Sequence, residues 1–436
     1  MRIGIIGAGP AGTICALTLL RGASQCGQQH EILLFDGKSF ERVGPQGCNM
    51  CAGVIADHLL AHLTALGAAV PPPLIQRAIR GFYLETPGGG AHIPKDPDAG
   101  ICTVFRSAGP RGEPAQAGQG FDNLLLRTAT AAGATHIPAM VIGLRMPESA
   151  KQPFRVQVAS GAKIEVDVVV GAFGMNSTLG ARFEQLGFGY RRPQTYQVCQ
   201  AELPLDEEYI EASFRGEVKI FSLGLPGIRF GALTPKRRHV TVTIIGPHLS
   251  RADLEQFVQH PAVRRQLPTG WALPAHYCHC HPQLPVTTAR HAVTDRLMVI
   301  GDAHVSRYLK GGIASSFFTG SLAAEMILRG ALSRGELWEG YVRPCHQRYC
   351  YDNLYGRLIF RWYDVVARTP WLALAALRTI EREQSLPPQH RCHTQVLWHI
   401  FAGDAPYAHI ARDALRPCII ASVMRELARG GKESTG

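Results

Sequence analysis

Three glycines near the start of the chain have the spacing of a dinucleotide-binding turn. The segment Gly7-Ala8-Gly9-Pro10-Ala11-Gly12 follows a predicted strand, residues 2–6, and opens a predicted helix, residues 10–22. In such a turn the first glycine permits the bend, the second admits a pyrophosphate, and the third lets helix and strand pack closely. Asp36 follows the next predicted strand, 31–35, where its carboxylate can accept both hydroxyls of a ribose. The sequence therefore predicts that the ADP half of a dinucleotide cofactor binds at Gly7, Gly9, Pro10, Ala11, Gly12 and Asp36.

A second glycine-rich segment lies almost 300 residues later. Gly301-Asp302-Ala303-His304 follows a predicted strand, 296–300, and Lys310-Gly311-Gly312-Ile313 precedes a predicted helix, 314–333. The aspartate can bind a chain of hydroxyls, and the glycines expose N–H groups suited to the N1–C2=O edge of a flavin, which becomes anionic on reduction. We therefore expect FAD, with Gly301, Asp302, Gly311, Gly312 and Ile313 among its contacts, and we interpret His304 as structural.

Cysteines form the third chemical feature. Cys48 and Cys51 lie in a Gly47–Gly53 loop, and Cys278 and Cys280 lie in the segment His276-Tyr277-Cys278-His279-Cys280-His281. Three interpretations stay open. The first pair could be a redox or catalytic dithiol beside the flavin, the four cysteines could bind a metal or cluster, or all could be buried thiols. Cys48 and Cys51 are our candidate catalytic side chains, and the metal site stays unassigned.

Composition limits the remaining choices. The 436 residues are 46% hydrophobic and 18% charged, which is typical of globular domains. The formal net charge is +11, but no nucleic-acid-binding motif accompanies it, so we expect no nucleic-acid partner. The sequence shows neither a signal peptide nor an apolar stretch long enough to cross a bilayer, and its 12 cysteines favour a reducing compartment. We expect a cytoplasmic protein, or one at the inner face of the membrane.

The C-terminal third has a different character. Residues 354–380 interleave Trp, Tyr, Phe and Leu with Arg on predicted helices, and helices are also predicted over 336–356. This pattern is typical of a helix that lies in a membrane interface or covers an apolar tunnel. A helical lid packed on the core would show the same pattern. Peripheral membrane contact is therefore one expectation.

Three segments together resemble the flavin signatures of the geranylgeranyl reductase family, which belongs to the group folded like p-hydroxybenzoate hydroxylase. These are the Gly7–Gly12 turn, VVVGAFGMNS at 168–177, and RLMVIGDAHVSRYLKGGI at 296–313. The resemblance covers about residues 1–335 and includes Arg106 and Gly109-Pro110-Arg111-Gly112. It implies an extended FAD, with Asp302 at the ribityl-pyrophosphate part, Gly311, Gly312 and Ile313 at the isoalloxazine, and Arg106 beside the cofactor. Phe173 replaces the family's usual Asp, which argues against hydroxylase-type reduction by NAD(P)H.

The predicted fold is α/β. It combines a Rossmann-like FAD-binding domain of the GR2 or hydroxylase type, an inserted antiparallel β-sheet substrate domain and a helical C-terminal region. The first comprises residues 1–80, 100–175 and 285–335, the second 81–99 and 176–284, and the third 336–436. Within them, strands are predicted at 81–84, 154–158, 166–170, 217–223 and 239–245, and a helix at 121–133.

The resulting hypothesis is an FAD-dependent oxidoreductase that reduces an apolar or isoprenoid-like, lipid-like substrate by hydride transfer through flavin N5. NAD(P)H or another reductant would be the transient electron donor. One alternative is an FAD-dependent monooxygenase of an aromatic or polyketide-like compound. A second is a membrane-associated electron-transfer flavoprotein that serves a redox partner protein through a Cys/His metal or redox relay.

Overall fold

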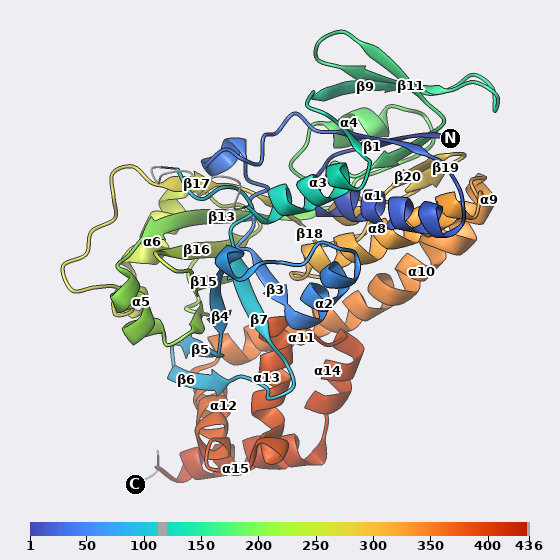
Figure 1. Cartoon of the computed structure of the whole chain (residues 1–436). Coiled ribbons are helices and arrows are strands. Elements are labelled where there is room, and N and C mark those ends of the chain that lie inside the picture. Colours follow the sequence, from blue (N-terminus) through green and yellow to red (C-terminus); the bar gives the residue numbers. More distant parts are fainter. Residues whose placement is uncertain (112–119, 434–436) are drawn as a thin grey trace.

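A parallel sheet carries the N-terminal turn. The computed structural model describes residues 1–111 and 120–433 (Figure 1). Its first sheet has the order β19 (Val293–Thr294), β20 (Leu297–Val299), β12 (Val168–Gly171), β1 (Arg2–Ile6), β2 (Glu31–Phe35) and β8 (Thr135–Ile137). All neighbours are parallel except β19 and β20. The strands are almost wholly apolar because both faces of this sheet are covered.

Helices α1 (Pro10–Gln25), α3 (Phe121–Ala131) and α8 (Gly312–Leu328) pack over one face of this sheet. Ile3, Ile5 and Leu34 point into that core, while Leu33 and Phe35 point to the opposite face. There they meet a small antiparallel sheet of β9 (Val141–Arg145), β10 (Phe154–Val158) and β11 (Lys163–Val166), with α4 (Leu179–Glu184) beside it. Alternation along each strand thus assigns its residues to two cores.

The second large sheet is mostly antiparallel. Its order is β17 (Cys278–Cys280), β13 (Thr195–Pro204), β16 (His239–Gly246), β15 (Phe230–Pro235), β14 (Glu217–Phe221), β5 (Gly81–Thr86) and β6 (Gly89–Pro94), and β18 (Gln283–Pro285) also pairs with β13. Only the β5–β14 pair is parallel among these. Helices α5 (Glu207–Phe214), α6 (Arg251–Gln259) and α7 (Pro261–Arg264) pack on one of its faces.

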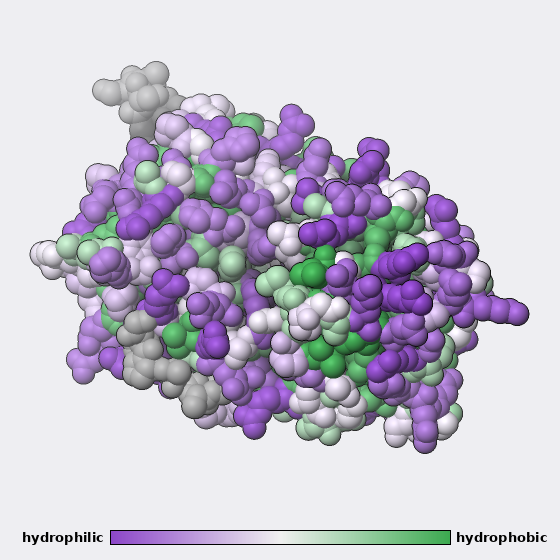
Figure 2. Space-filling view, turned by 90° about the horizontal axis from the view of Figure 1, so that it is seen from above, coloured by the Kyte–Doolittle hydropathy of each residue, from purple (hydrophilic) through white to green (hydrophobic). Residues whose placement is uncertain are grey.

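A short sheet of β3 (Val54–Ala56), β7 (Ile101–Val104) and β4 (Ile75–Ile79) joins the two larger ones, with α2 (Asp57–Ala65) directly after β3. The C-terminal helices lie at the end of the molecule opposite the β9–β11 sheet (Figure 1). They are α11 (Tyr351–Arg368), α12 (Pro370–Glu383), α13 (Cys392–Ala402), α14 (Tyr407–Ala414) and α15 (Pro417–Glu433). The short helices α9 (Arg334–Leu337) and α10 (Arg343–Cys345) precede them and lie on the side of the first sheet, where α9 contacts β19. Seen from above, the surface is mostly hydrophilic, and hydrophobic side chains gather to the right of its centre (Figure 2).

The predicted fold class is confirmed: a parallel α/β unit, a mostly antiparallel second sheet and a helical C-terminal region are all present. The strands predicted at 154–158 and 239–245 correspond to β10 and β16. The three predicted residue ranges for the domains stay a prediction. Gly112 of the stretch before α3 lies outside the described residues.

Two predicted elements were wrong in detail. The strand over 166–170 is divided at Asp167, whose carboxylate accepts a hydrogen bond from the Arg2 backbone N–H at 2.7 Å. Val166 therefore ends β11 in one sheet, and Val168 begins β12 in another. The single helix over 336–356 is interrupted by π-helical turns at Trp338–Val342 and His346–Cys350, on either side of the segment with Pro344. Helix α11 then begins only at Tyr351.

Gly12→Ala tests the contact between α1 and the preceding turn. A Cβ at this position would lie 1.9 Å from the carbonyl oxygen of Gly7, which is backbone and has little room to move. We expect a loss of about 3 kcal/mol in the free energy of unfolding, measured by urea titration. Gly335→Ala is the control, because nothing lies within 4 Å of its Cβ position. A Gly12→Ala protein as stable as this control would contradict the packing described.

Candidate functional site

The N-terminal turn has the geometry of a pyrophosphate site. Gly7 has φ +111°, and a Cβ there would lie 2.4 Å from the Ala172 carbonyl oxygen. Gly9 caps α1, whose first-turn N–H groups have no acceptor within the helix. Pro10 and Ala11 begin that helix and are buried. Because Gly7 and Gly9 have no side chains, an anion can approach the N–H groups at the start of α1.

Asp36 lies beside this turn at the end of β2. Its Oδ2 accepts the Ala8 N–H at 2.9 Å, and its Oδ1 accepts the Lys38 N–H at 2.9 Å. These two bonds fix the orientation of the carboxylate. Each oxygen keeps a further lone pair, which can accept a ribose hydroxyl. The position is the one expected for an adenosine ribose.

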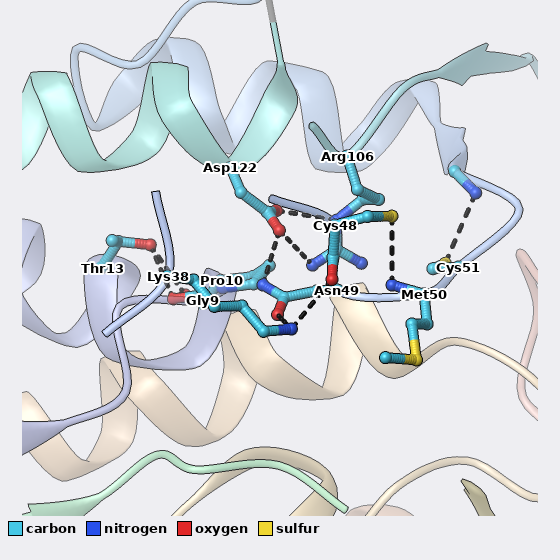
Figure 3. Close-up of polar contacts among 11 residues, drawn as sticks. Gly9, Pro10, Thr13, Lys38, Cys48, Asn49, Met50, Cys51, Arg106 and Asp122 are labelled. Carbon is cyan, nitrogen blue, oxygen red and sulfur yellow. Dashed lines mark hydrogen bonds and ion pairs between the residues drawn. The ribbon is translucent and has the colours of Figure 1, made fainter. Parts of the chain in front are cut away.

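A buried network lies over Gly9 (Figure 3). Arg106 donates through Nε and Nη2 to the two oxygens of Asp122, at 2.7 and 3.0 Å. Asp122 also accepts from Asn49 Nδ2 at 2.6 Å, and Asn49 Oδ1 accepts from Lys38 Nζ at 3.1 Å. A Cβ on Gly9 would lie 3.2 Å from that Asn49 amide nitrogen. The network thus ties the loop after β2, the end of β7 and the start of α3 to the turn.

Burial controls the electrostatics of this network. The Arg106 side chain is 7% exposed and that of Asp122 is not exposed at all. Burial disfavours the charged guanidinium, but the adjacent Asp122 carboxylate outweighs it, so the pKa of Arg106 is raised. The Arg106 guanidinium therefore stays charged. Removing either partner would leave an uncompensated charge in the core.

The later glycine segment completes the site from the other side. A Cβ on Gly301 would lie 2.9 Å from the Cβ of Ala11, so the two glycine segments touch. Gly311 has φ +72° and caps α8, and Gly312 opens that helix. Asp302 follows β20, and burial raises the pKa of its carboxyl group. Its Oδ1 is shielded from solvent and has no hydrogen-bond partner among the described residues.

The residues present fit an extended FAD. The Asp302 oxygen without a partner is suited to a ribityl hydroxyl, the start of α1 to a pyrophosphate, and the start of α8 to the anionic edge of a flavin. Residues Gly7, Gly9, Gly12, Asp36, Asp302, Gly311 and Gly312 would hold the cofactor, with Ile313 buried behind them. Lys38, Asn49 and Asp122 were missing from the predicted site, since the hydrogen bonds that link them to one another and to Arg106 form only on folding.

An apolar cavity of about 220 Å³ begins at this glycine segment. Gly311, Gly312 and Ile313 form part of its wall. The rest is mostly carbon, from β3, the second sheet and helices α11 and α13: Val54, Ile55, Phe82, Val218, Ile220, Phe230, Ala232, Ile245, Phe360, Phe401 and Ala402. Thr243 also lines it, and its shielded Oγ1 has no hydrogen-bond partner in the described part of the chain.

Two cations attach the C-terminal helices to the flavin segment. Lys310 Nζ donates to the Phe401 carbonyl at 2.7 Å, and Arg307 donates to the carbonyls of Gly403 and Ala405. Burial, together with nearby Arg307, lowers the pKa of Lys310 to about 8. The loop after α13 is therefore held against the segment that precedes α8.

Cys48 and Cys51 lie in the loop that contains Asn49, and Cys278 and Cys280 lie on β17 of the second large sheet. Cys48 and Cys51 are free, partly buried thiols, each of which accepts a backbone N–H, from Met50 at 3.2 Å and Gly53 at 3.4 Å. Burial raises the pKa of Cys48 and of Cys280, and the two groups are near enough to influence each other. Within residues 1–111 and 120–433, however, no cluster of three or more His, Cys, Asp or Glu side chains is arranged to hold a metal ion.

Two further residues from the sequence analysis have structural contacts, His304 in the core and the partly buried Phe173 at its edge. His304 is fully buried, with Nδ1 2.9 Å from the Tyr341 hydroxyl, and burial beside His346 lowers its pKa to about 3. It is thus neutral near pH 7. Phe173 packs against Phe183 with ring centroids 4.6 Å apart, so an aromatic contact replaces the acid of the related signature.

The Arg106–Asp122 pair makes a sharp stability test. Arg106→Ala leaves a buried carboxylate without its main partner, and we expect a loss of about 3–5 kcal/mol in the free energy of unfolding. The double variant Arg106→Met/Asp122→Leu removes both charges and should lose much less. Urea titration of the three proteins measures this difference. A double variant at least as unstable as Arg106→Ala would show that burial of the unpaired charge is not the cause.

The contact of His399 on α13 with Asp404 predicts a pH dependence. His399 Nδ1 lies 2.8 Å from Asp404, and its Nε2 lies 3.7 Å from Asp96. The hydrogen bond to Asp404 outweighs burial and raises the pKa of His399, with Asp96 and Asp413 adding to it. Its stabilising contribution is therefore complete below about pH 6.5 and disappears as the pH rises through the raised pKa.

His399→Gln should remove this contribution. We expect the stability difference between wild type and His399→Gln to be larger at about pH 5.5 than at about pH 8, measured by thermal or urea unfolding. Because both proteins share every other titrating group, the comparison isolates His399. An identical difference at both pH values would show that this contact is not formed as described.

Comparison with known proteins agrees with this geometry. No protein-family model matches the chain. The chain is 23% identical over 349 residues to a chloroplastic geranylgeranyl diphosphate reductase of Nicotiana tabacum, covering 76% of this chain and 67% of that protein.

Solved structures show the same fold. A geranylgeranyl bacteriochlorophyll reductase-like protein of Thermoplasma acidophilum matches with a TM-score of 0.61 and 15% identity, over 98% of this chain and 95% of that one. A flavoprotein/dehydrogenase of Cytophaga hutchinsonii matches with a TM-score of 0.65 and 14% identity, over 99% of this chain and 100% of that one. A halogenase solved with phloroglucinol and FAD matches with a TM-score of 0.62 and 12% identity, over 98% of this chain and 96% of that one. The chain thus has the fold of these geranylgeranyl reductase-like proteins, flavoproteins and flavin-dependent halogenases.

Proposed function

We propose that this protein is an FAD-dependent reductase of an apolar, isoprenoid-like substrate. The observation that carries the proposal is the apolar cavity walled by Gly311, Gly312 and Ile313. A flavin held at the start of α8 would border this cavity. Apolar walls of this kind favour the binding of a hydrocarbon group. The sequence similarity to a geranylgeranyl diphosphate reductase supports the same substrate class.

Bound FAD would supply hydride transfer to and from N5, the redox chemistry that no side chain provides. The chain's own residues position the substrate and exclude water. Phe230, Phe360 and Phe401 contribute large apolar surface, and the loop after α13 covers one side of the cavity. A dry site favours reaction of a carbon skeleton over leakage of electrons to solvent.

The Thr243 hydroxyl is a polar group in the cavity wall that has no hydrogen-bond partner among the described residues. Thr243 lies on β16 opposite Ala232 of β15, and both line the cavity. Because its Oγ1 has no protein partner in the described chain, it can hydrogen-bond a polar group of the substrate. The Tyr363 hydroxyl, by contrast, is already 2.7 Å from the Ser222 hydroxyl. We expect Thr243 to orient the substrate rather than to react.

Cys48 and Cys51 are the side chains that we propose for proton transfer. Saturation of a carbon–carbon double bond needs a proton as well as a hydride. Ala52, the neighbour of Cys51, lines the cavity, and burial keeps the Cys48 thiol protonated by raising its pKa. A protonated thiol is a poor nucleophile, so proton donation suits Cys48 better than covalent attack.

A monooxygenase of an aromatic substrate is the second candidate. Several of the structural matches are flavin-dependent halogenases or brominases, so the same fold also surrounds other flavin reactions. The apolar cavity could equally solvate an aromatic ring. The donor of electrons, whether NAD(P)H or another reductant, is likewise part of the proposal. The product formed with and without oxygen separates the two candidates.

The decisive experiment reduces the FAD-loaded protein chemically under argon and mixes it with geranylgeranyl diphosphate. We expect the flavin to reoxidise at a rate that depends on substrate concentration, and mass spectrometry to find product with a saturated double bond. Ala232→Phe, which fills the cavity, should keep FAD but lower this rate about tenfold or more. The surface variant Ala162→Phe is the matched control. Reoxidation only by oxygen, with an oxygenated product from an aromatic substrate, would favour the monooxygenase instead.

A further inference from the structure

Helix α11 has an unpartnered apolar stripe on its outer face. Its members are Tyr351, Leu354, Tyr355, Leu358, Trp362 and Val365. At about 100° per residue they fall within a sector about 100° wide. Leu358 is 67% exposed and Trp362 64%. Trp371, at the start of the next helix, α12, is also 61% exposed.

The fold does not need this stripe. The opposite face of α11 carries the contacts to the core: Phe360 is 2% exposed, and Gly356 packs against Tyr407. Phe360 and Tyr363 also line the apolar cavity. One face of the helix is therefore a cavity wall while the other presents large apolar side chains to the outside. An aligned patch of this kind marks an interaction site more often than scattered apolar residues do.

Charge along the helix identifies the occupant. Arg357, Arg361 and Arg368 are exposed and follow one flank of the stripe. The two acids of α11 are turned inward, where Asp364 pairs with Arg229 at 2.8 Å and Asp352 accepts the N–H groups of Tyr407 and Ala408. The outer surface thus combines aromatic and aliphatic groups with positive charge alone.

From these contacts we propose that α11 docks, parallel to the surface, on a membrane rich in anionic lipids. Tyr and Trp favour the headgroup region, Leu and Val reach the acyl boundary, and arginines attract anionic headgroups. Within residues 1–111 and 120–433 no helix is long and apolar enough to cross a bilayer, so the contact is peripheral. A protein partner of the same chemistry, or a second copy of the chain, would be a different occupant.

Helix α11 lies between the apolar stripe and the apolar cavity. Because α11 separates the stripe from the cavity by the thickness of one helix, docking would bring the cavity wall next to the lipid. An apolar substrate could then pass beside α11 without crossing water. This delivery role rests on the proposed function, whereas the docking itself does not.

Vesicle co-sedimentation of the FAD-loaded full chain tests the docking without using activity. We expect binding to phosphatidylcholine vesicles that contain phosphatidylglycerol, weaker binding to phosphatidylcholine alone, and loss of binding at high salt. Leu358→Ser/Trp362→Ser should weaken binding to the anionic vesicles about tenfold or more. Arg361→Glu should weaken it and reduce its salt dependence.

Matched controls come from surface positions elsewhere on the molecule. Met140→Ser removes a side chain that is 63% exposed, and Arg182→Glu reverses an exposed charge on α4; both should bind vesicles as the wild type does. Retained FAD and an unchanged thermal midpoint show that each variant is folded. Equal vesicle binding by Leu358→Ser/Trp362→Ser and Met140→Ser would overturn the proposal. So would a wild-type dimer without lipid that Leu358→Ser/Trp362→Ser makes monomeric, because the stripe would then be a subunit interface.

Discussion

Backbone contact between helices α1 and α8 is the constraint on which the site depends. A Cβ on Gly320 of α8 would lie 2.7 Å from the Ala11 carbonyl oxygen, and Gly301 touches Ala11 as closely. Glycine at these positions lets the start of α1 pack against the middle of α8 and against the Gly301 segment, although these segments lie about 300 residues apart in the chain. One extended cofactor can then reach both positive helix ends. The polar contacts of the site attach further segments to this pair of helices.

Polar contacts then fix the segments on either side of that helix pair. The ion pair of Arg106 and Asp122, with Asn49, holds the Cys48–Cys51 loop over the first turn. Arg307 and Lys310 hold the loop after α13 beside the second. Arg106 and Arg307 are buried cations, which are costly unless their N–H groups are bonded, so these hydrogen bonds help to hold both loops beside the glycine segments. The apolar cavity owes its walls to the same attachments.

Local chemistry in the sequence was enough to predict part of this arrangement. Gly7, Gly12 and Asp36 lie within one β-α-β unit. Their roles in the turn, in helix–strand packing and in ribose binding depend only on adjacent elements, so the sequence alone was enough to predict them. The period-2 pattern at Phe154–Val158 likewise predicted β10 correctly. The division of 166–170 at Asp167 was not predicted, since it depends on Arg2 in a strand far away in the chain.

The remaining features depend on register and packing between distant segments. Thr243 lines the cavity only because β16 pairs with β15 so that Thr243 lies opposite Ala232. Asn49, which accepts from Lys38, reaches Asp122 only after α3 has packed beside α1. The outer stripe of α11 was predicted as a mixture of aromatic residues and arginines. Which face it occupies, and that Asp352 and Asp364 turn inward, required the structure.

A crystal structure of the protein with bound FAD would test the central claim most directly. The account predicts the ADP half at Gly9 and Asp36, and the flavin N1–C2=O edge within hydrogen-bond distance of the Gly311 or Gly312 N–H, with the ring bordering the apolar cavity. A flavin ring bound in the open, polar groove lined by Asn176, Arg192 and Cys280 would contradict it. So would an adenine half placed away from Asp36.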